Sequence, residues 1–220
     1  MSNYLELGVP DLLRRAKLMR QIHYSRVFPC GASVAIFAAM ALEAYPHDLA
    51  LLLGTSLRQA DDPPSLDAAS SILEQLEQDR VQIKAKYSIL YYVLSGLPMP
   101  KGEQPYQDLA LLIDVRNQIA HLKPSLREYR VDRMDLPKPV ANLLQRVSSR
   151  KIIERDLINE PGLLTFPWTM VLDESDTFVE WAVDLVYRVI HFMHDAISDC
   201  ETKKKRLDIL IPRLTKDQLM

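Results

Sequence analysis

Glycine and cysteine are scarce in this sequence, and each scarcity excludes a class of binding site. Only six glycines occur in 220 residues, and they do not form the glycine-rich motifs that hold the phosphates of nucleotides or dinucleotides. The two cysteines, Cys30 and Cys200, provide neither a disulfide framework nor a pair with the spacing of a zinc site. We therefore expect no glycine-rich nucleotide-cofactor site and no zinc ion held by paired cysteines, and the sequence predicts no other cofactor.

Long apolar runs are also lacking. The longest uncharged stretch covers residues 27–42, is rich in alanine and contains Pro29. It falls short of the ~20 apolar residues that a membrane-spanning helix needs, and no basic segment followed by an apolar stretch opens the chain. We therefore expect a buried helix in this stretch, no membrane association and a cytoplasmic location.

The spacing of the apolar residues predicts an all-α protein. Hydrophobic residues make up 48% of the chain and charged residues 25%, which is ordinary for a globular protein. Apolar residues recur at helical spacing, and we expect helices over residues 10–24, 31–53, 65–95, 109–122, 140–158 and 175–200. A strand-like alternation occurs only at 162–172. The sequence therefore predicts a helical bundle.

The end of the helix expected over residues 109–122 is the most informative segment. Because Pro124 disfavours helical geometry in the residue before it, this helix should end near Leu122. Arg116 and His121 then lie in its last two turns, about 140° apart around the axis and roughly 7.5 Å apart along it. An arginine side chain can span that gap, so both groups can reach one phosphate.

The same two residues also have a purely structural interpretation. Arg116 falls near the middle of the apolar arc of this helix, where a charge needs a partner. His121 lies on a flank with Asp114 and Asn117. Arg116 can thus be an ion-pairing residue, and His121 a cap that is favoured by the helix dipole. The spacing alone does not distinguish these interpretations.

Arg116, Asn117 and His121 together resemble the signature of the HEPN family (higher eukaryote and prokaryote nucleotide-binding domains). That signature is an arginine, often followed by asparagine, with a histidine several residues later. The alanine-rich segment 38–44 resembles the family's helix that bears one glutamate, here Glu43, and residues 86–106 resemble its lead into the signature helix. The resemblance covers roughly residues 30 to 124. Leu122 replaces the tyrosine of the toxin subgroup that is paired with nucleotidyltransferases, which argues against that subgroup.

The resemblance implies metal-independent RNA cleavage by an Arg-x4-His site that two copies of the chain form together as a homodimer. Arg116, Asn117 and His121 would be the catalytic residues, and Glu43 would support them by orienting the arginine. RNA supplies its own nucleophile, the 2′-hydroxyl. A histidine can exchange protons near neutral pH, and an arginine can stabilise charge on the phosphate. The resemblance also implies a role as a toxin or phage-defence effector, with an antitoxin or a regulatory protein as partner.

The resemblance also implies a single HEPN-like domain over residues 1–220. Its core would comprise about 10–124 and the C-terminal helix 175–200, and residues 125–174 would form a basic insertion. From Arg116 to Asp156 the chain has ten Lys and Arg residues against five Asp and Glu residues, a net charge of +5, which leaves −7 for the rest. We predict that Lys123, Arg127 and Arg130 bind RNA. The alternative is that these charges are scattered over solvated surface.

Glu43 is the only charged residue between Val27 and Pro46. Because an apolar core disfavours an unpaired charge, we predict that Glu43 contacts Arg116, which lies in similar surroundings on another helix. The pair can orient the arginine for substrate, or it can simply hold two helices in register.

The remaining histidines give weaker signals. His191 and His194 lie three residues apart, but no second cluster completes a metal site, and His23 and His47 have no grouped partners in the sequence. Two other classes of function stay open. The chain can be a HEPN-type module that binds RNA or nucleotides without cleavage, or a helical scaffold in which the motif is structural.

Overall fold

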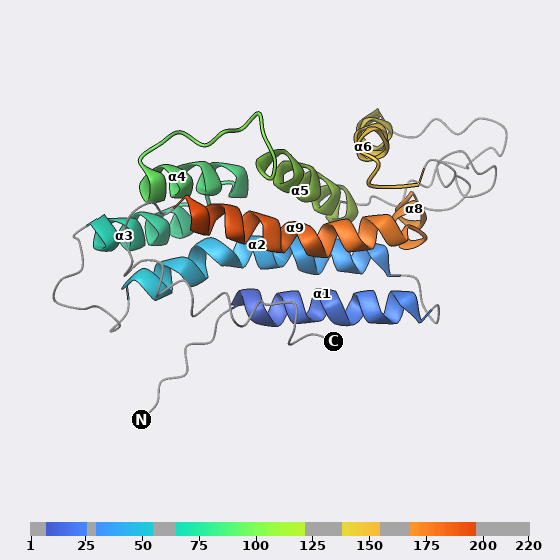
Figure 1. Ribbon diagram of the computed structural model, residues 1–220, viewed down its shortest axis with the longest axis horizontal. Helices are drawn as coiled ribbons and strands as arrows, with labels where there is room; N and C mark the ends of the chain where they lie inside the picture. Colours follow the sequence, from blue (N-terminus) through green and yellow to red (C-terminus); the bar gives the residue numbers. More distant parts are fainter. Residues whose placement is uncertain (1–7, 26–29, 55–64, 122–137, 155–167, 197–220) are drawn as a thin grey trace, which may run out of the picture. The chain divides into compact units, whose positions relative to one another are not determined.

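The computed structural model describes residues 8–25, 30–54, 65–121, 138–154 and 168–196. All regular elements in these ranges are α-helices, so the predicted all-α class is confirmed for the described residues. Figure 1 shows them in chain order: α1 (Gly8–Tyr24), α2 (Gly31–Gly54), α3 (Ser65–Gln78), α4 (Ile83–Ser95), α5 (Tyr106–Ala120), α6 (Lys138–Ser149), α8 (Thr169–Asp173) and α9 (Asp176–Asp195).

The prediction of one helix over residues 65–95 is wrong, because the chain turns between α3 and α4. Arg80 adopts a left-handed backbone conformation with φ 51°. Its amide donates a hydrogen bond to the Glu77 carbonyl, and the Val81 amide donates one to the Leu76 carbonyl, both at 3.1 Å. These bonds are the pair that ends a helix in a Schellman motif. The arginine takes the position that glycine usually occupies.

The helix predicted over 140–158 ends early for the same reason. Lys151 has φ 58°, and its amide donates to the Ser148 carbonyl at 2.9 Å. The Ile152 amide donates to the Val147 carbonyl at 3.1 Å. This second Schellman motif terminates α6 at Ser149, and residues 155–158 lie outside the described part of the chain.

The strand candidate at 162–172 is also wrong where the structure describes it, because residues 169–172 belong to α8. Residues 162–167 lie outside the described ranges. The C-terminal helix predicted over 175–200 is confirmed as α9, whose bounds are Asp176–Asp195. Phe178, Leu185 and Val189 of this helix are buried, whereas Trp181 and Phe192 are half-buried.

The helices fall into two compact units that alternate along the chain. The first comprises Met1–Leu13, Met40–Leu109 and Val186–Met220, and the second comprises Arg14–Ala39 and Ala110–Leu185. Several helices thus contribute one part to each unit. Glu43 belongs to the first unit, whereas Arg116, Asn117 and His121 belong to the second.

Aromatic residues form the centre of the first unit. Tyr45 and Tyr87 are fully buried, and their rings stack with centroids 6.2 Å apart. The Tyr87 hydroxyl donates to the Leu42 carbonyl at 2.9 Å. Asp48, also buried, accepts hydrogen bonds from the amides of Gly8 and Val9 and so caps the start of α1.

The second unit brings the start of α2 against the end of α8. A Cβ atom on Gly31 would lie only 2.0 Å from the carbonyl oxygen of Leu172, so no larger residue fits this position. The Asp173 carboxylate accepts a hydrogen bond of 2.8 Å from the Ala32 amide and caps α2. The core of the second unit is aliphatic and aromatic. Its fully buried residues include Val34, Leu111, Leu112, Val115, Phe178 and Ala182.

The apolar part of helix α2 is longer than the stretch 27–42, which the sequence analysis judged too short to span a membrane. The stretch Gly31–Leu51 is long and apolar enough to cross a membrane, although 61% of it is buried inside the structure. A core helix of a folded protein has the same length and composition. The prediction of a buried helix therefore holds for most of this stretch.

Candidate functional site at the end of helix α5

Helix α5 is held by its apolar face, which leaves one flank for polar residues. Asp108 lies in its first turn, where a negative charge is favoured by the helix dipole. In the first unit, its carboxylate accepts a hydrogen bond of 3.0 Å from Arg188 on α9. In the second unit, the apolar residues Leu111, Leu112, Ile113 and Val115 are buried.

Arg116 is half-buried and turns toward the polar flank of α5. Its Nη1 atom donates a hydrogen bond of 3.0 Å to Oδ1 of Asn117. This bond carries the guanidinium to the same flank as His121, because residues 117 and 121 lie one turn apart on a helix. The structure therefore brings the predicted arginine and asparagine into direct contact.

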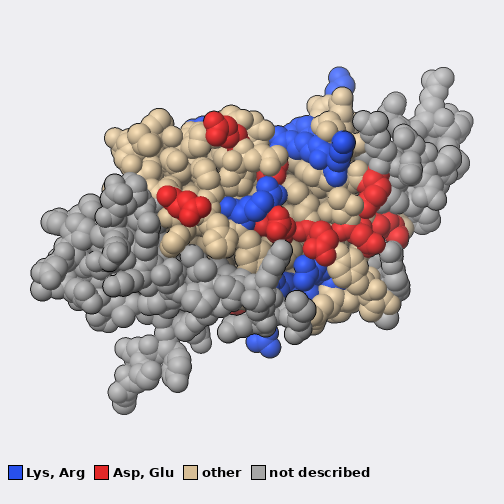
Figure 2. All heavy atoms as spheres, viewed as in Figure 1, with Lys and Arg blue, Asp and Glu red and all other residues tan. Residues whose placement is uncertain are grey.

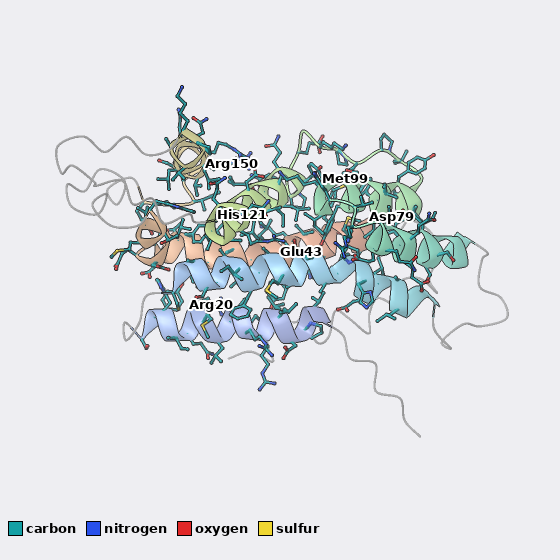
Figure 3. The ribbon with its side chains drawn as sticks, turned by 180° about the vertical axis from the view of Figure 1, so that it is seen from behind. Arg20, Glu43, Asp79, Met99, His121 and Arg150 are labelled. Carbon is teal, nitrogen blue, oxygen red and sulfur yellow. The ribbon has the colours of Figure 1, made fainter. Side chains whose placement is uncertain are left out.

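His121 follows directly after the last helical residue of α5, near the end predicted from Pro124. Its amide donates to the Asn117 carbonyl at 3.0 Å, so the helical turn extends to this residue. Its side chain is exposed and makes no hydrogen bond or ion pair with the described residues. Figure 3 shows it where the helix ends.

A neighbouring helix joins the same flank. Nη1 of Arg146 on α6 lies 2.9 Å from Oδ2 of Asp114 on α5. Asp114 precedes Asn117 by one turn and His121 by two turns. The polar flank of α5 thus presents the Asp114–Arg146 ion pair, then Asn117 with the bound guanidinium, and finally His121.

The predicted support from Glu43 is not tested by this arrangement. Glu43 lies on the part of α2 that belongs to the first unit, and Arg116 lies in the second. Both side chains are half-buried, so the assumption that each is enclosed in the core is wrong. Their contact stays a prediction.

The predicted RNA-binding residues Lys123, Arg127 and Arg130 lie outside the described residues. On α9, His191 is exposed, and Nδ1 of His194 lies 3.9 Å from Oδ1 of Asp195. Among the described residues, no group of three or more His, Cys, Asp or Glu side chains is arranged to hold a metal ion.

A polar network in the second unit was missed by the sequence analysis. His23, expected to have no grouped partner, is only 2% exposed, and its Nε2 lies 2.8 Å from Oδ1 of Asp176. One turn further along α9, Glu180 accepts hydrogen bonds from Arg20 and from the Tyr24 hydroxyl. Burial, together with the bond to Glu180, raises the pKa of Tyr24. These pairs join residues that are 153 to 160 positions apart, so no local sequence pattern could predict them.

No protein-family model matches this chain, and no curated protein or solved structure matches it either. The functional argument consequently depends on the residues at the end of α5 and on their surroundings.

Proposed function

We propose that this protein is a metal-independent endoribonuclease of the HEPN type, with a site that two copies of the chain form together. The observation that carries the proposal is the hydrogen bond from Arg116 to Asn117. It gathers a guanidinium on the flank of α5 that ends at an exposed histidine. The HEPN-like order of Arg116, Asn117 and His121 in the sequence supports the same conclusion.

In the proposed reaction, His121 of one copy removes the proton from the ribose 2′-hydroxyl, and the 2′-oxygen attacks the adjacent phosphorus. The bond from phosphorus to the 5′-oxygen breaks, and His121 of the other copy protonates that oxygen. The products are a 2′,3′-cyclic phosphate and a 5′-hydroxyl. Arg116 stabilises the charge on the non-bridging oxygens, and Asn117 holds the guanidinium in position.

Incubation of the purified protein with RNA in the presence of EDTA tests this proposal. We expect cleavage by the wild type, and a loss of roughly 10²–10⁴-fold in His121→Ala, because a general acid–base group contributes about that much. Arg116→Ala should lose about 10²–10³-fold, as expected for one donor that stabilises transition-state charge. His191→Ala is the matched control, since it removes another exposed histidine, on α9.

The products and the substrate analogue provide independent readouts. RNA fragments should end in a 2′,3′-cyclic phosphate, and DNA of the same sequence should remain intact for want of the 2′-hydroxyl. Cleavage that requires added magnesium, or full activity of His121→Ala, would refute the mechanism. Salt-dependent RNA binding without cleavage would instead favour the non-catalytic binding module.

The shared site is tested by mixing variants. Each pure variant, His121→Ala or Arg116→Ala, lacks one kind of group in both copies, whereas a mixed dimer retains one of each. Because the single His121 of a mixed dimer can act as base or as acid but not as both, we expect the mixture to exceed either pure variant in activity and to stay well below the wild type, which should scatter light as a dimer. An active protein that is monomeric at micromolar concentration would contradict the shared site.

A further inference from the structure

Helix α6 in the second unit buries one face and exposes the other. Val140, Leu143, Leu144 and Val147 are at most 6% exposed, at the spacing of three and four expected for a helix on a core. The opposite face carries Asn142, Gln145 and Ser149, which are all exposed. This outer face is therefore polar and faces solvent.

The charge on this outer face has one sign only. Residues 138–153 include four Lys and Arg residues and no Asp or Glu. Lys138, Arg146 and Lys151 are exposed, and Arg150 is half-buried. Within the described part of the chain, Lys138 and Lys151 make no ion pair. The basic surface of α6 is defined here as Lys138, Arg146, Arg150 and Lys151.

The contrast with the acidic residues of the same unit is visible on the surface. Figure 2 shows blue side chains gathered around α6, and a separate row of red side chains along α9. Two acids of α9, Asp176 and Glu180, bind His23, Arg20 and Tyr24 within the unit. Among the described residues, Lys138 and Lys151 therefore contribute positive charge that no ion pair offsets, and Arg146 adds a partly exposed guanidinium.

The basic surface is attached to the motif helix. Arg146 pairs with Asp114 at 2.9 Å while its side chain remains 47% exposed. Asp114 and His121 are seven residues apart, which places them within about 20° around the α5 axis and roughly 10.5 Å apart along it. A polyanion that lies on Arg146 is therefore within two helical turns of the imidazole.

We propose that the basic surface of α6 binds the phosphate backbone of an RNA strand and leads it to the His121 end of α5. Lysine and arginine neutralise phosphates, while the side-chain amides of Asn142 and Gln145 supply hydrogen bonds to phosphate and ribose oxygens. This surface gives the positioning that the motif residues alone do not provide. The inference rests on the proposed ribonuclease function.

Binding of a 2′-O-methyl RNA oligonucleotide, measured by fluorescence anisotropy over a range of salt, tests the surface without cleavage. The test variant is Lys138→Gln with Lys151→Asn, in which asparagine suits the left-handed backbone at 151. The matched control is Arg14→Gln with Lys101→Gln, which removes two exposed charges outside α6. Thermal unfolding of both double variants verifies that each remains folded.

Each phosphate contact with a single strand contributes about 0.7 to the slope of log K against log salt. We therefore expect the test variant to lower that slope by roughly 1.4 and to weaken binding about 25-fold at 0.1 M salt. The control should change both values little. Equal losses in the two double variants would overturn the inference, as would wild-type binding that does not depend on salt.

Competition separates RNA from other polyanions. Polyglutamate should displace the oligonucleotide far less well than unlabelled RNA of equal charge, and equal displacement would refute an RNA surface. The two proposals fail in different ways. Salt-dependent binding that the α6 variant weakens, without any cleavage of ordinary RNA, would refute the ribonuclease but leave the surface standing. Cleavage with unchanged binding in the α6 variant would refute the surface alone.

Discussion

The start of α9 depends on one carboxylate, that of Glu154, which offers a sharp test of the structure. Glu154 accepts hydrogen bonds from the hydroxyls of Ser175 and Thr177, both at 2.5 Å, and from the Thr177 amide at 3.1 Å. The Ser175 hydroxyl in turn accepts a bond from the Phe178 amide, as an N-cap does. Glu154→Gln keeps the size of the side chain and removes its charge.

The expected loss follows from these contacts. Removing an N-cap costs about 0.5–2 kcal/mol, and a negative charge at a helix N-terminus contributes roughly 0.3–1 kcal/mol at an exposed site. Glutamine retains one acceptor oxygen, so we expect Glu154→Gln to lower the free energy of unfolding by about 1 kcal/mol at neutral pH. For a chain of this length that corresponds to a melting temperature lower by roughly 2–4 °C.

The effect should also depend on pH. Burial acts to raise the pKa of Glu154, but the hydrogen bonds from Ser175 and Thr177 outweigh it and hold the pKa below its ordinary value. A carboxylate with a lowered pKa in the folded state stabilises the protein above its unfolded pKa of about 4.3, and this contribution is lost as the pH falls through the folded value. The difference between wild type and Glu154→Gln should therefore be full at pH 7 and shrink under acid conditions.

Thermal unfolding followed by circular dichroism at pH 7, 5 and 3 measures this difference. Glu103→Gln is the matched control, because Glu103 is an exposed acid in the loop before α5. A loss of stability that is the same at all three pH values would show that the charge of Glu154 is irrelevant. Equal melting temperatures for Glu154→Gln and the control at pH 7 would contradict the capping role itself.

Two further predictions concern other positions. Gly31→Ala should lower the free energy of unfolding by about 1–3 kcal/mol or more, because the new Cβ atom would meet backbone atoms that no side-chain movement can relieve. Gly102→Ala, whose Cβ would have nothing within 4 Å, is the control in the same thermal assay. A similar melting temperature for both variants would contradict the close approach of α2 to α8. If Glu43 contacts Arg116, Glu43→Ala should lower the free energy of unfolding by about 1–3 kcal/mol, which is more than His121→Ala should lower it. The same variant should also reduce RNA cleavage. Equal melting temperatures of these two variants would count against the contact.

The helices themselves could be predicted from the sequence, but two of their ends could not. Apolar spacing located α1, α2, α5 and α9 to within a few residues. The ends of α3 and α6 were missed because Arg80 and Lys151 adopt the left-handed conformation that a reader expects of glycine. Nothing in the identity of an exposed arginine or lysine signals that conformation, since the hydrogen bonds that follow it are what stabilise the turn.

The candidate site could be predicted only as far as it is local. Arg116, Asn117 and His121 share one helix, so helical geometry alone gathers them on its last turns. The pairing of Asp114 with Arg146 joins residues 32 positions apart across two helices and had no signature in either segment. The half-burial of Arg116 was missed for a related reason, because an apolar neighbourhood in sequence does not fix how far a long side chain extends from the core.

The capping of α2 by Asp173 has a consequence for how the protein is made. The two residues that meet there, Ala32 and Asp173, are separated by 141 positions. A ribosome that adds roughly 5–20 residues per second needs about 7–28 s to cover that distance. During this interval the start of α2 has emerged while its acceptor has not yet been synthesised. The second unit thus completes its assembly only late in translation, when α8 and the first part of α9 join the helices that were synthesised before them.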